Sequence, residues 1–393
     1  MATIKKRGNS YLIRVSCGYD INGNHKEQSF TWIPDEGMSK RQIEKELNRQ
    51  AVMFEEACNH GYKASAVKFQ ELAEEWFESY AKNTLRSTTY ERMLQLKHRV
   101  YPAIGHLRID KITARQLQGF VNSLAKEGAS EKTGKALAPK TIRHNLSLIS
   151  DVFNYAVRMD IVSENPCRKV VIPKGEIKEK PIYSQEEIAK LLTAINGEAT
   201  KYRAFFFLIA YSGFRRSEML GLEWKDIDFD NDIISVKRTS NYTAERGIYT
   251  DTTKTKRSKR VLKISPYIMG ILKELKAEQE EEAIRLGDKW VETDRLFVKW
   301  NGEPMNNQTP YGWLKEFCEK NDMPFYGIHS FRHFAASALI SSGLDVVTVS
   351  GALGHCNSGT TLNIYSHMFQ TAQAKVAQAM DGAFSFIPQD ATT

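Results

Sequence analysis

The sequence predicts a mainly helical chain of the α+β class, with several domains and small β-sheets at two places. Its 393 residues exceed what one ordinary hydrophobic core accommodates, so two or three domains are expected. Apolar residues recur at helical spacing from Lys68 to about Arg168 and again after Ser184. Apolar and polar residues alternate near the N-terminus and after Trp224, which is typical of strands.

The composition is compatible with a polyanionic partner without identifying one. The formal net charge is +8 at pH 7 and the sequence pI is about 9.0. The five cysteines are odd in number, scattered and without paired metal-ligand spacing, which favours a reduced cytoplasm and no structural zinc: Cys17, Cys58, Cys167, Cys318 and Cys356. No apolar run approaches the roughly 20 residues that span a bilayer, so a soluble protein without membrane contact is expected.

Residues 1–64 predict a small three-stranded module followed by a helix. The segment opens with Lys5-Lys6-Arg7, alternates over residues 11–16, turns near Asn22-Gly23-Asn24 and returns over residues 28–33. Ser39 then precedes a helical stretch at residues 41–58. The module is basic and rich in strands.

Residues 65–168 predict four helices, over 69–77, 88–101, 113–124 and 139–159. Breaks are expected at Asn83, at Pro102 to Gly105 and at Gly128 to Gly134. Short polar and basic groups suited to phosphates and base edges gather near the first break and on the last helix. They are Lys82, Arg86, Ser87, Thr88, Thr141, Arg143, His144 and Asn145, and any one alone also fits a plain solvated position.

Residues 169–182 form a cationic linker without helical periodicity, and a further domain covers residues 183–393. It opens with a capping box at Ser184-Gln185-Glu186-Glu187. Three strands are expected over 227–236, 247–253 and 260–264, with helices at 265–286 and 311–320, a short strand at 296–298, and a tail helix at 371–380. The basic turn at 254–259 is either a solvated hairpin tip or a finger in the DNA minor groove.

Two arginine-containing segments supply the candidate chemistry. Gly213-Phe214-Arg215-Arg216-Ser217-Glu218 follows an apolar helix and delivers Arg215 at a turn, while His329-Ser330-Phe331-Arg332 puts two polar side chains on one side of a helix. An arginine makes bidentate contacts to phosphate oxygens, and a histidine donates hydrogen bonds and exchanges protons near neutral pH. By itself His-x-x-Arg is a weak pattern.

Taken together, the chain resembles the tyrosine recombinases, specifically the integrases of phages and conjugative transposons, over nearly its whole length. Gly-Phe-Arg-Arg-Ser-Glu followed by Leu-Glu-Trp-Lys-Asp is similar to the first arginine box of the family, which makes Arg215, and not Arg216, the catalytic candidate. The other family motifs are present as well. His329-x-x-Arg332 is similar to the second box, and Leu353-Gly354-His355 supplies the later histidine. Tyr365 in Asn-Ile-Tyr-Ser-His occupies the nucleophile position, and Lys254 is similar to the lysine of the family's β-hairpin. The implied catalytic residues are Arg215, Lys254, His329, Arg332, His355 and Tyr365.

The resemblance implies a reaction. Arg215 and Arg332 would clamp the nonbridging phosphate oxygens, with His329 and His355 adding hydrogen bonds as charge develops. Tyr365 would attack to form a 3′-phosphotyrosyl bond, while Lys254 protonates the 5′-hydroxyl leaving group. The covalent bond stores the phosphodiester energy, so neither ATP, a metal nor another cofactor is expected. The sequence contains no phosphate-binding Gly-x-x-x-x-Gly-Lys-Ser/Thr loop and no paired acidic cluster of the two-metal kind.

The resemblance also implies the domains and partners. Residues 1–64 would bind arm-type DNA sites, 65–168 would form the helical core-binding, SAM-like domain, and 183–393 would be the catalytic domain with a C-terminal tail. The implied partners are double-stranded DNA at core and arm attachment sites, other copies of the chain in a homotetramer on DNA, and an excisionase or a host DNA-bending protein. The implied location is the bacterial cytoplasm, at the nucleoid.

Other functions also fit the sequence. An Xer-type resolvase or a type IB topoisomerase would share the chemistry, although the additional N-terminal module favours an integrase that bridges arm and core sites. A noncatalytic DNA-binding regulator of the same fold is the alternative from a different class.

Overall fold

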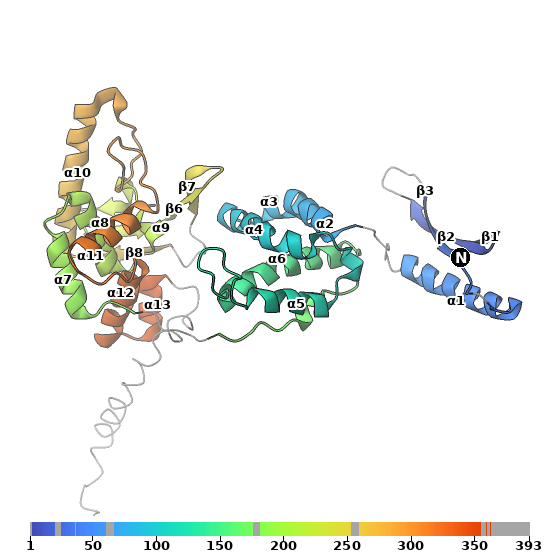
Figure 1. Ribbon diagram of the computed structural model, residues 1–393. Helices are drawn as coiled ribbons and strands as arrows, with labels where there is room; N and C mark the ends of the chain where they lie inside the picture. The colour runs from blue at the N-terminus through green and yellow to red at the C-terminus, as the bar shows by residue number, and fades with distance from the viewer. Residues whose placement is uncertain are drawn as a thin grey trace, which may run out of the picture. The chain divides into compact units, whose positions relative to one another are not determined.

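The computed structural model describes residues 2–19, 25–35, 37–59, 67–175, 181–252 and 259–354, together with Gly359 and Leu362. Two compact units divide the chain, Met1–Ile177 and Lys178–Thr393, and the elements of each are labelled in Figure 1. Among the described residues, no helix has the length and apolar character that a membrane crossing requires.

The N-terminal module is a three-stranded antiparallel sheet with one helix, as predicted. Its strands are β1 (Thr3–Arg7), β2 (Ser10–Tyr19) and β3 (His25–Trp32), in the order β1-β2-β3. Helix α1 (Lys40–Asn59) begins after Ser39, whose hydroxyl accepts a hydrogen bond from the Gln42 amide. Ile13 on the sheet packs with Leu47 and Ala51 of the helix, so one face of β2 is buried.

The helical part of the first unit contains the four predicted helices. They are α2 (Phe69–Trp76), which continues through the π-helical turn η1 (Phe77–Ala81) into α3 (Lys82–Thr84), and then α4 (Ser87–Val100), α5 (Ala114–Leu124) and α6 (Pro139–Arg158). Short turns accompany them: η2 (Tyr101–Gly105), η3 (Ile109–Lys111) and η4 (Pro166–Lys169). Large apolar side chains, among them Trp76, Phe77 and Phe153, fill one core between these helices.

One predicted break is shifted along the chain to Leu85, and another falls in a π-helical turn. Asn83 lies within α3, and the backbone becomes extended only at Leu85, with φ −90° and ψ 149°. Pro102 does not end the helix either, because it lies inside the π-helical turn η2, which directly continues α4. Such turns occur where the regular helical hydrogen bonding is interrupted.

The polar residues expected to face DNA in this unit differ in exposure. Asn145 is completely buried and its Nδ2 donates to the Thr141 carbonyl oxygen at 2.9 Å, so it supports α6 from within and is not a surface contact. Exposed Arg92, Lys140 and Arg143 surround His144. Partial burial, and then these three charges, lower the pKa of the His144 imidazole. Helices α4 and α6 therefore present a basic surface.

The second unit is built around the apolar helix α8. Its helices are α7 (Gln185–Ile195), α8 (Thr200–Ser212), α9 (Arg216–Met219), α10 (Pro266–Leu286), α11 (Thr309–Lys320), α12 (His329–Ser341) and α13 (Val346–Leu353), with short turns η5 (Trp224–Asp226) and η7 (Gly287–Lys289). Buried Phe205, Phe206 and Ile209 of α8 belong to the main core, against which α7, α10 and α12 pack (Figure 1). The predicted capping box forms at Ser184 and Glu187.

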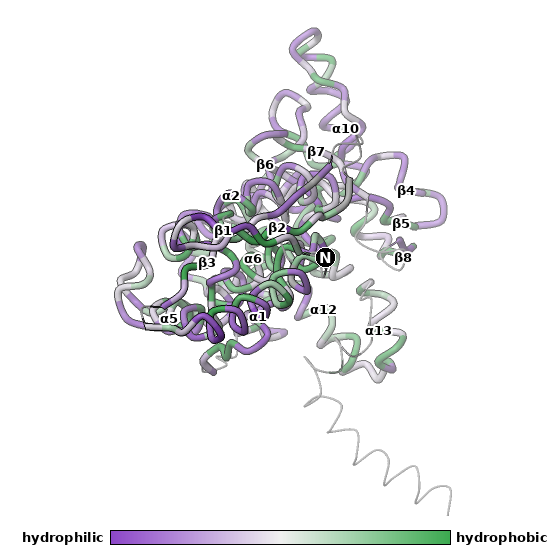
Figure 2. Tube along the Cα trace, turned by 90° about the vertical axis from the view of Figure 1, so that its right-hand side faces the viewer, coloured by the Kyte–Doolittle hydropathy of each residue, from purple (hydrophilic) through white to green (hydrophobic). Residues whose placement is uncertain are grey.

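The strands of this unit differ from the prediction. Among the described residues of this unit, five strands form two antiparallel groups. One is a sheet in the order β4-β5-β8 (Ile227–Asp228, Ile233–Val236 and Arg260–Lys263), and the other is a hairpin of β6 (Arg238–Thr243) and β7 (Gly247–Thr252). Strand β6 was not predicted because its residues are mainly polar, and the hairpin is largely hydrophilic or neutral in Figure 2. The short strand expected at 296–298 is also absent from the described fold, where Val298 makes only a single bridge with Pro304.

Candidate functional site

The turn that carries Arg215 is set by a glycine. Helix α8 ends at Gly213, whose φ of +61° and ψ of +22° lie in the left-handed region that suits glycine. Phe214 then points into the core, fully buried. Arg215 follows with an extended backbone and caps α9. An apolar helix, a left-handed glycine and a buried phenylalanine thus bring Arg215 to the edge of the core.

Glu218 holds Arg215 in place. Its side chain is 2% exposed, and its Oε1 accepts from Nη1 of Arg215 at 2.7 Å while its Oε2 accepts from the Arg215 amide at 2.9 Å. Arg215 Nη2 donates to the carbonyl oxygen of Gly354 at 2.9 Å. The Arg215 side chain nevertheless remains 34% exposed, so part of the guanidinium is accessible to a ligand.

A second arginine, from strand β8, contacts the same carboxylate. Arg260 Nη2 lies 2.9 Å from Glu218 Oε2, and Arg260 Nε donates to the Ala352 carbonyl oxygen at 2.8 Å. Burial would raise the pKa of the Glu218 carboxyl, but the contacts with Arg260 and Arg215 outweigh it and hold that pKa below its usual value. The carboxylate is therefore ionised near neutral pH and orients two guanidinium groups.

Arg332 reaches the same turn from α12. It is 3% exposed, and its Nη1 donates to the Gly213 carbonyl oxygen at 2.7 Å. Phe331, the preceding residue, packs on Phe206 of α8 with ring centroids 5.5 Å apart, which fixes α12 against α8. Gly213 makes this approach possible, because a Cβ there would lie 2.7 Å from Leu353 Cδ2 and 3.1 Å from Ala335 Cβ.

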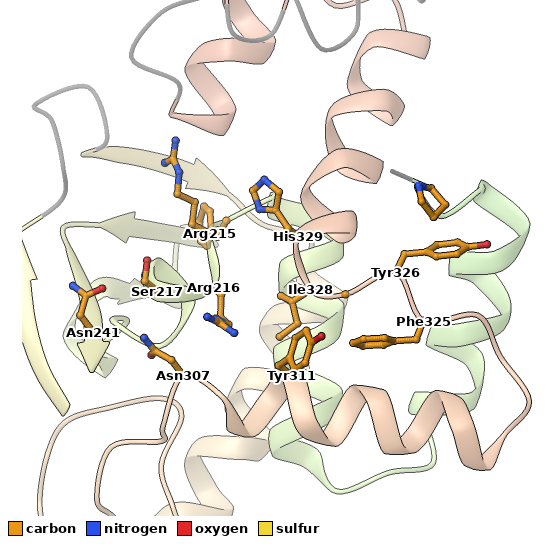
Figure 3. A pocket seen from close by; sticks show the side chains of 13 residues that line it. Arg215, Arg216, Ser217, Asn241, Asn307, Tyr311, Phe325, Tyr326, Ile328 and His329 are labelled. Carbon is orange, nitrogen blue, oxygen red and sulfur yellow. The ribbon is translucent and has the colours of Figure 1, made fainter. Parts of the chain in front are cut away.

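His329 begins α12 and lines a pocket of about 780 Å³ together with Arg215. Its ring meets that of His333 edge-on, with centroids 4.9 Å apart. Figure 3 shows Arg215 and His329 at the same end of the pocket. The remaining lining residues come from α9, β6, α11 and the segments before α7, α9, α11 and α12: Pro181, Phe214, Arg216, Ser217, Asn241, Asn307, Tyr311, Phe325, Tyr326, Gly327 and Ile328.

The β6–β7 hairpin is attached beside this pocket by buried charges. Arg295 is 6% exposed and donates to the Gly221 carbonyl oxygen and to Thr250 Oγ1, each at 2.6 Å. Arg238 of β6 pairs with Glu223 at 2.8 Å. A Cβ on Gly221 would lie 2.8 Å from the Arg238 carbonyl oxygen, so the turn after α9 and strand β6 are in close contact. Asn241 is thereby held at the pocket.

Three of the six predicted site residues lie in the described part of the chain. Arg215 and Arg332 meet at the Gly213 turn, and His329 shares the pocket with Arg215. Lys254, His355 and Tyr365 lie outside the described residues, and so does the tail after Leu362. Strand β7 pairs with β6, and β8 pairs with β5, so the hairpin predicted between β7 and β8 is wrong in its pairing.

Arg260 was not predicted to be a member of the site. Its alternating segment predicted a strand, but nothing local indicated that the guanidinium would pair with Glu218. Three guanidinium groups and one carboxylate leave this cluster with an excess of positive charge. Such a cluster can bind an anion with the geometry of a phosphate and stabilise negative charge that develops on its oxygens.

Comparison with protein families gives two matches. The phage integrase family matches residues 182–371, and the phage integrase N-terminal SAM-like domain matches residues 68–125. Among curated proteins, a tyrosine recombinase XerC-like protein of Caldanaerobacter subterraneus is 28% identical, covering 97% of this chain and 98% of that protein. The ICEBs1 integrase of Bacillus subtilis is 26% identical, covering 97% and 99% respectively.

Solved structures share the fold. The Tn1549 transposon integrase in complex with circular intermediate DNA matches with a TM-score of 0.63 and 21% identity, over 80% of this chain and 100% of that one. A lambda integrase tetramer bound to a Holliday junction matches with a TM-score of 0.53 and 14% identity, over 90% of this chain and 96% of that one.

Proposed function

Because this chain is a tyrosine recombinase of the phage and conjugative-transposon type, an enzyme that integrates and excises DNA by strand cleavage and rejoining, we propose that Arg215, His329 and Arg332 bind the phosphate it cleaves. The observation that carries this assignment is the convergence of Arg215 and Arg332 on one turn although they are far apart in sequence. Guanidinium groups aimed at one phosphate neutralise its charge and favour attack by a nucleophile.

Within this site Glu218 and Arg260 are positioning residues. The buried carboxylate contacts both Arg215 and Arg260, which restricts the orientation of the Arg215 guanidinium. Fixed donors stabilise developing charge without reorganising at the moment of reaction, so this restraint contributes to the rate. Neither residue needs to gain or lose a proton.

We assign the remaining roles to Tyr365, Lys254 and His355. Tyr365 attacks the phosphorus atom and gives up its phenolic proton to water, and the bond to the 5′-oxygen breaks as Lys254 donates a proton to that oxygen. His355 donates a hydrogen bond to the phosphate. Two contacts support this assignment: Gly354, which precedes His355, accepts from Arg215, and Arg260, six residues after Lys254, lies in the site. Rejoining reverses these steps with the 5′-hydroxyl of another strand, which conserves the bond energy.

The other domains would hold the DNA. We assign arm-site binding to residues 1–64, core-site binding to residues 65–168 and linkage to residues 169–182, with the catalytic domain at 183–393. The basic surface of α4 and α6 supports the core-binding role. Recombination needs four strand cuts, so we propose a homotetramer on two duplexes, aided by an excisionase or a DNA-bending protein and acting at the bacterial nucleoid.

The test is the substitution Tyr365→Phe, which removes one oxygen and keeps the ring. The parent protein should form a covalent complex with a nicked core-site duplex, detected as a shifted band under denaturing conditions, and the variant should form none. Binding affinity should hardly change, because most of it comes from phosphate contacts across the protein.

Two outcomes would contradict this proposal. A covalent complex with Tyr365→Phe would place the nucleophile at another residue. A parent protein that binds its core site but never forms the complex would favour the noncatalytic regulator.

A further inference from the structure

Arg216 lies in the pocket of the proposed active site but at a different place from Arg215. The two side chains leave consecutive residues in opposite directions, with Arg216 pointing toward Tyr311 and Asn307 (Figure 3). Arg215, Arg216 and His329 all line this one pocket of about 780 Å³. The Arg216 end therefore offers a second binding place on the same surface.

The charge of Arg216 is not balanced within the described part of the chain. Burial lowers the pKa of its guanidinium, and the ionisable Tyr311 hydroxyl is the group that opposes this shift. Two other arginines of this unit with little exposure pair with carboxylates: Arg238 with Glu223 and Arg260 with Glu218. A partly buried cation without such a partner is costly, so a bound anion would stabilise it.

Polar groups suited to the same ligand surround it. Ser217, Asn241, Asn307 and Tyr311 line this end of the pocket. Asn307 Oδ1 is buried and accepts no hydrogen bond from the described residues. The Asn241 side chain is held in place, because its Nδ2 donates to Thr239 Oγ1 at 3.1 Å. Hydroxyls, amides and arginine are the groups that proteins direct at DNA phosphates.

We propose that Arg216 binds a second phosphate of the cleaved strand, close to the phosphate at Arg215, with Asn307 and Tyr311 donating hydrogen bonds to it. The inference rests on the proposed function, which puts the cleaved phosphate at Arg215 and His329. Because the pocket is continuous from those residues to Arg216, a strand held at one end runs along to the other. Arg216 is then a DNA-positioning residue that fixes the strand in register with the nucleophile.

The experiment replaces single phosphates with neutral methylphosphonates. Core-site duplexes carrying one such change at each position around the cleaved bond are titrated with the full-length protein and with Arg216→Met. The parent should bind about tenfold more weakly when one flanking phosphate is neutralised. The variant should bind the unmodified duplex about tenfold more weakly, lose about one unit from its salt-dependence slope, and show no further loss at that same position.

Controls separate this contact from general effects. Arg285→Met alters an exposed arginine at the end of α10 and should retain the full phosphate sensitivity of the parent. Arg216→Lys keeps the charge and should restore part of the affinity. If Arg216→Met does not fold, judged by its thermal unfolding, Asn307→Ala takes its place and should reduce the sensitivity at that phosphate.

The outcomes separate a failure of the Arg216 assignment from a failure of the proposed function. If Arg216→Met loses affinity but keeps full sensitivity at every flanking phosphate, or loses sensitivity to a base change instead, the inference is overturned. If no flanking phosphate matters to the parent, it is overturned as well. In each case covalent complex formation by the parent on a nicked duplex reports whether the proposed function itself holds.

Discussion

Replacing Glu218 with glutamine tests whether a buried carboxylate organises the arginines of the site. Glu218→Gln keeps the size of the side chain and an oxygen that can accept from the Arg215 amide, but it removes the charge. Arg260, whose side chain is 7% exposed, then loses its buried counterion. Breaking a buried ion pair from one side costs about 3 to 5 kcal/mol in the free energy of unfolding.

That loss should be visible in thermal unfolding. For a domain of this size, each kcal/mol lowers Tm by about 2 to 4 °C, so a loss of 3 kcal/mol predicts a fall of roughly 6 to 12 °C. The assay is calorimetry of the full-length protein, with the transition of the second unit followed separately. Covalent complex formation should also slow, because the Arg215 guanidinium is less restrained.

The chain offers a matched control in Glu282→Gln. Glu282 and Arg285 also form an ion pair three residues apart, but the Arg285 side chain is 69% exposed and that of Glu282 is 34% exposed. Exposed pairs contribute at most about 1 kcal/mol, so this Tm should hardly change. Equal Tm values for the two variants would refute the argument that burial makes Glu218 important.

The effect of Glu218 should also depend on pH. Its folded-state pKa is lowered, because the contacts with Arg260 and Arg215 outweigh the effect of burial. A group with a lowered pKa contributes stability above its unfolded pKa of about 4.3 and loses that contribution as the pH falls through the folded value. The difference in stability between the parent and Glu218→Gln should therefore be constant near neutral pH and shrink below about pH 4.

Three further predictions concern the turn, the basic surface and the N-terminal module. Gly213→Ala should lower the free energy of unfolding by about 2 to 5 kcal/mol, because alanine is strained in the left-handed region and its Cβ would meet Leu353 at 2.7 Å. The control Gly270→Ala, in a helix where a Cβ would meet nothing within 4 Å, should not destabilise the protein. Equal denaturation midpoints for the two variants would contradict this prediction. DNA phosphates should raise the lowered pKa of His144, so core-site affinity should increase from pH 8 to about pH 6, and a His144→Gln variant with the same slope would rule the contact out. A chain that starts at Ala66 should lose arm-site binding in gel-shift assays but still cleave the core site, and unchanged arm-site affinity would exclude the N-terminal module as the reader.

Local signals in the sequence were enough to predict most helices and one half of the site. Gly213 follows an apolar run, and its left-handed conformation depends only on the lack of a side chain, so the end of α8 and the position of Arg215 could be predicted. The capping box at Ser184 is likewise formed by neighbours in sequence. Strands β2 and β3 of the N-terminal sheet also followed from patterns over short segments.

Only the tertiary structure decided which groups meet. Arg260 lies 42 residues from Glu218 and Arg332 lies 119 residues from Gly213, and no local pattern encodes either contact. Tertiary packing also decides which strands β7 and β8 pair with, that β6 forms a strand, and that Asn145 is buried. Capping and periodicity depend on residues a few positions apart, whereas strand pairing and buried ion pairs depend on how separate elements pack around a shared core.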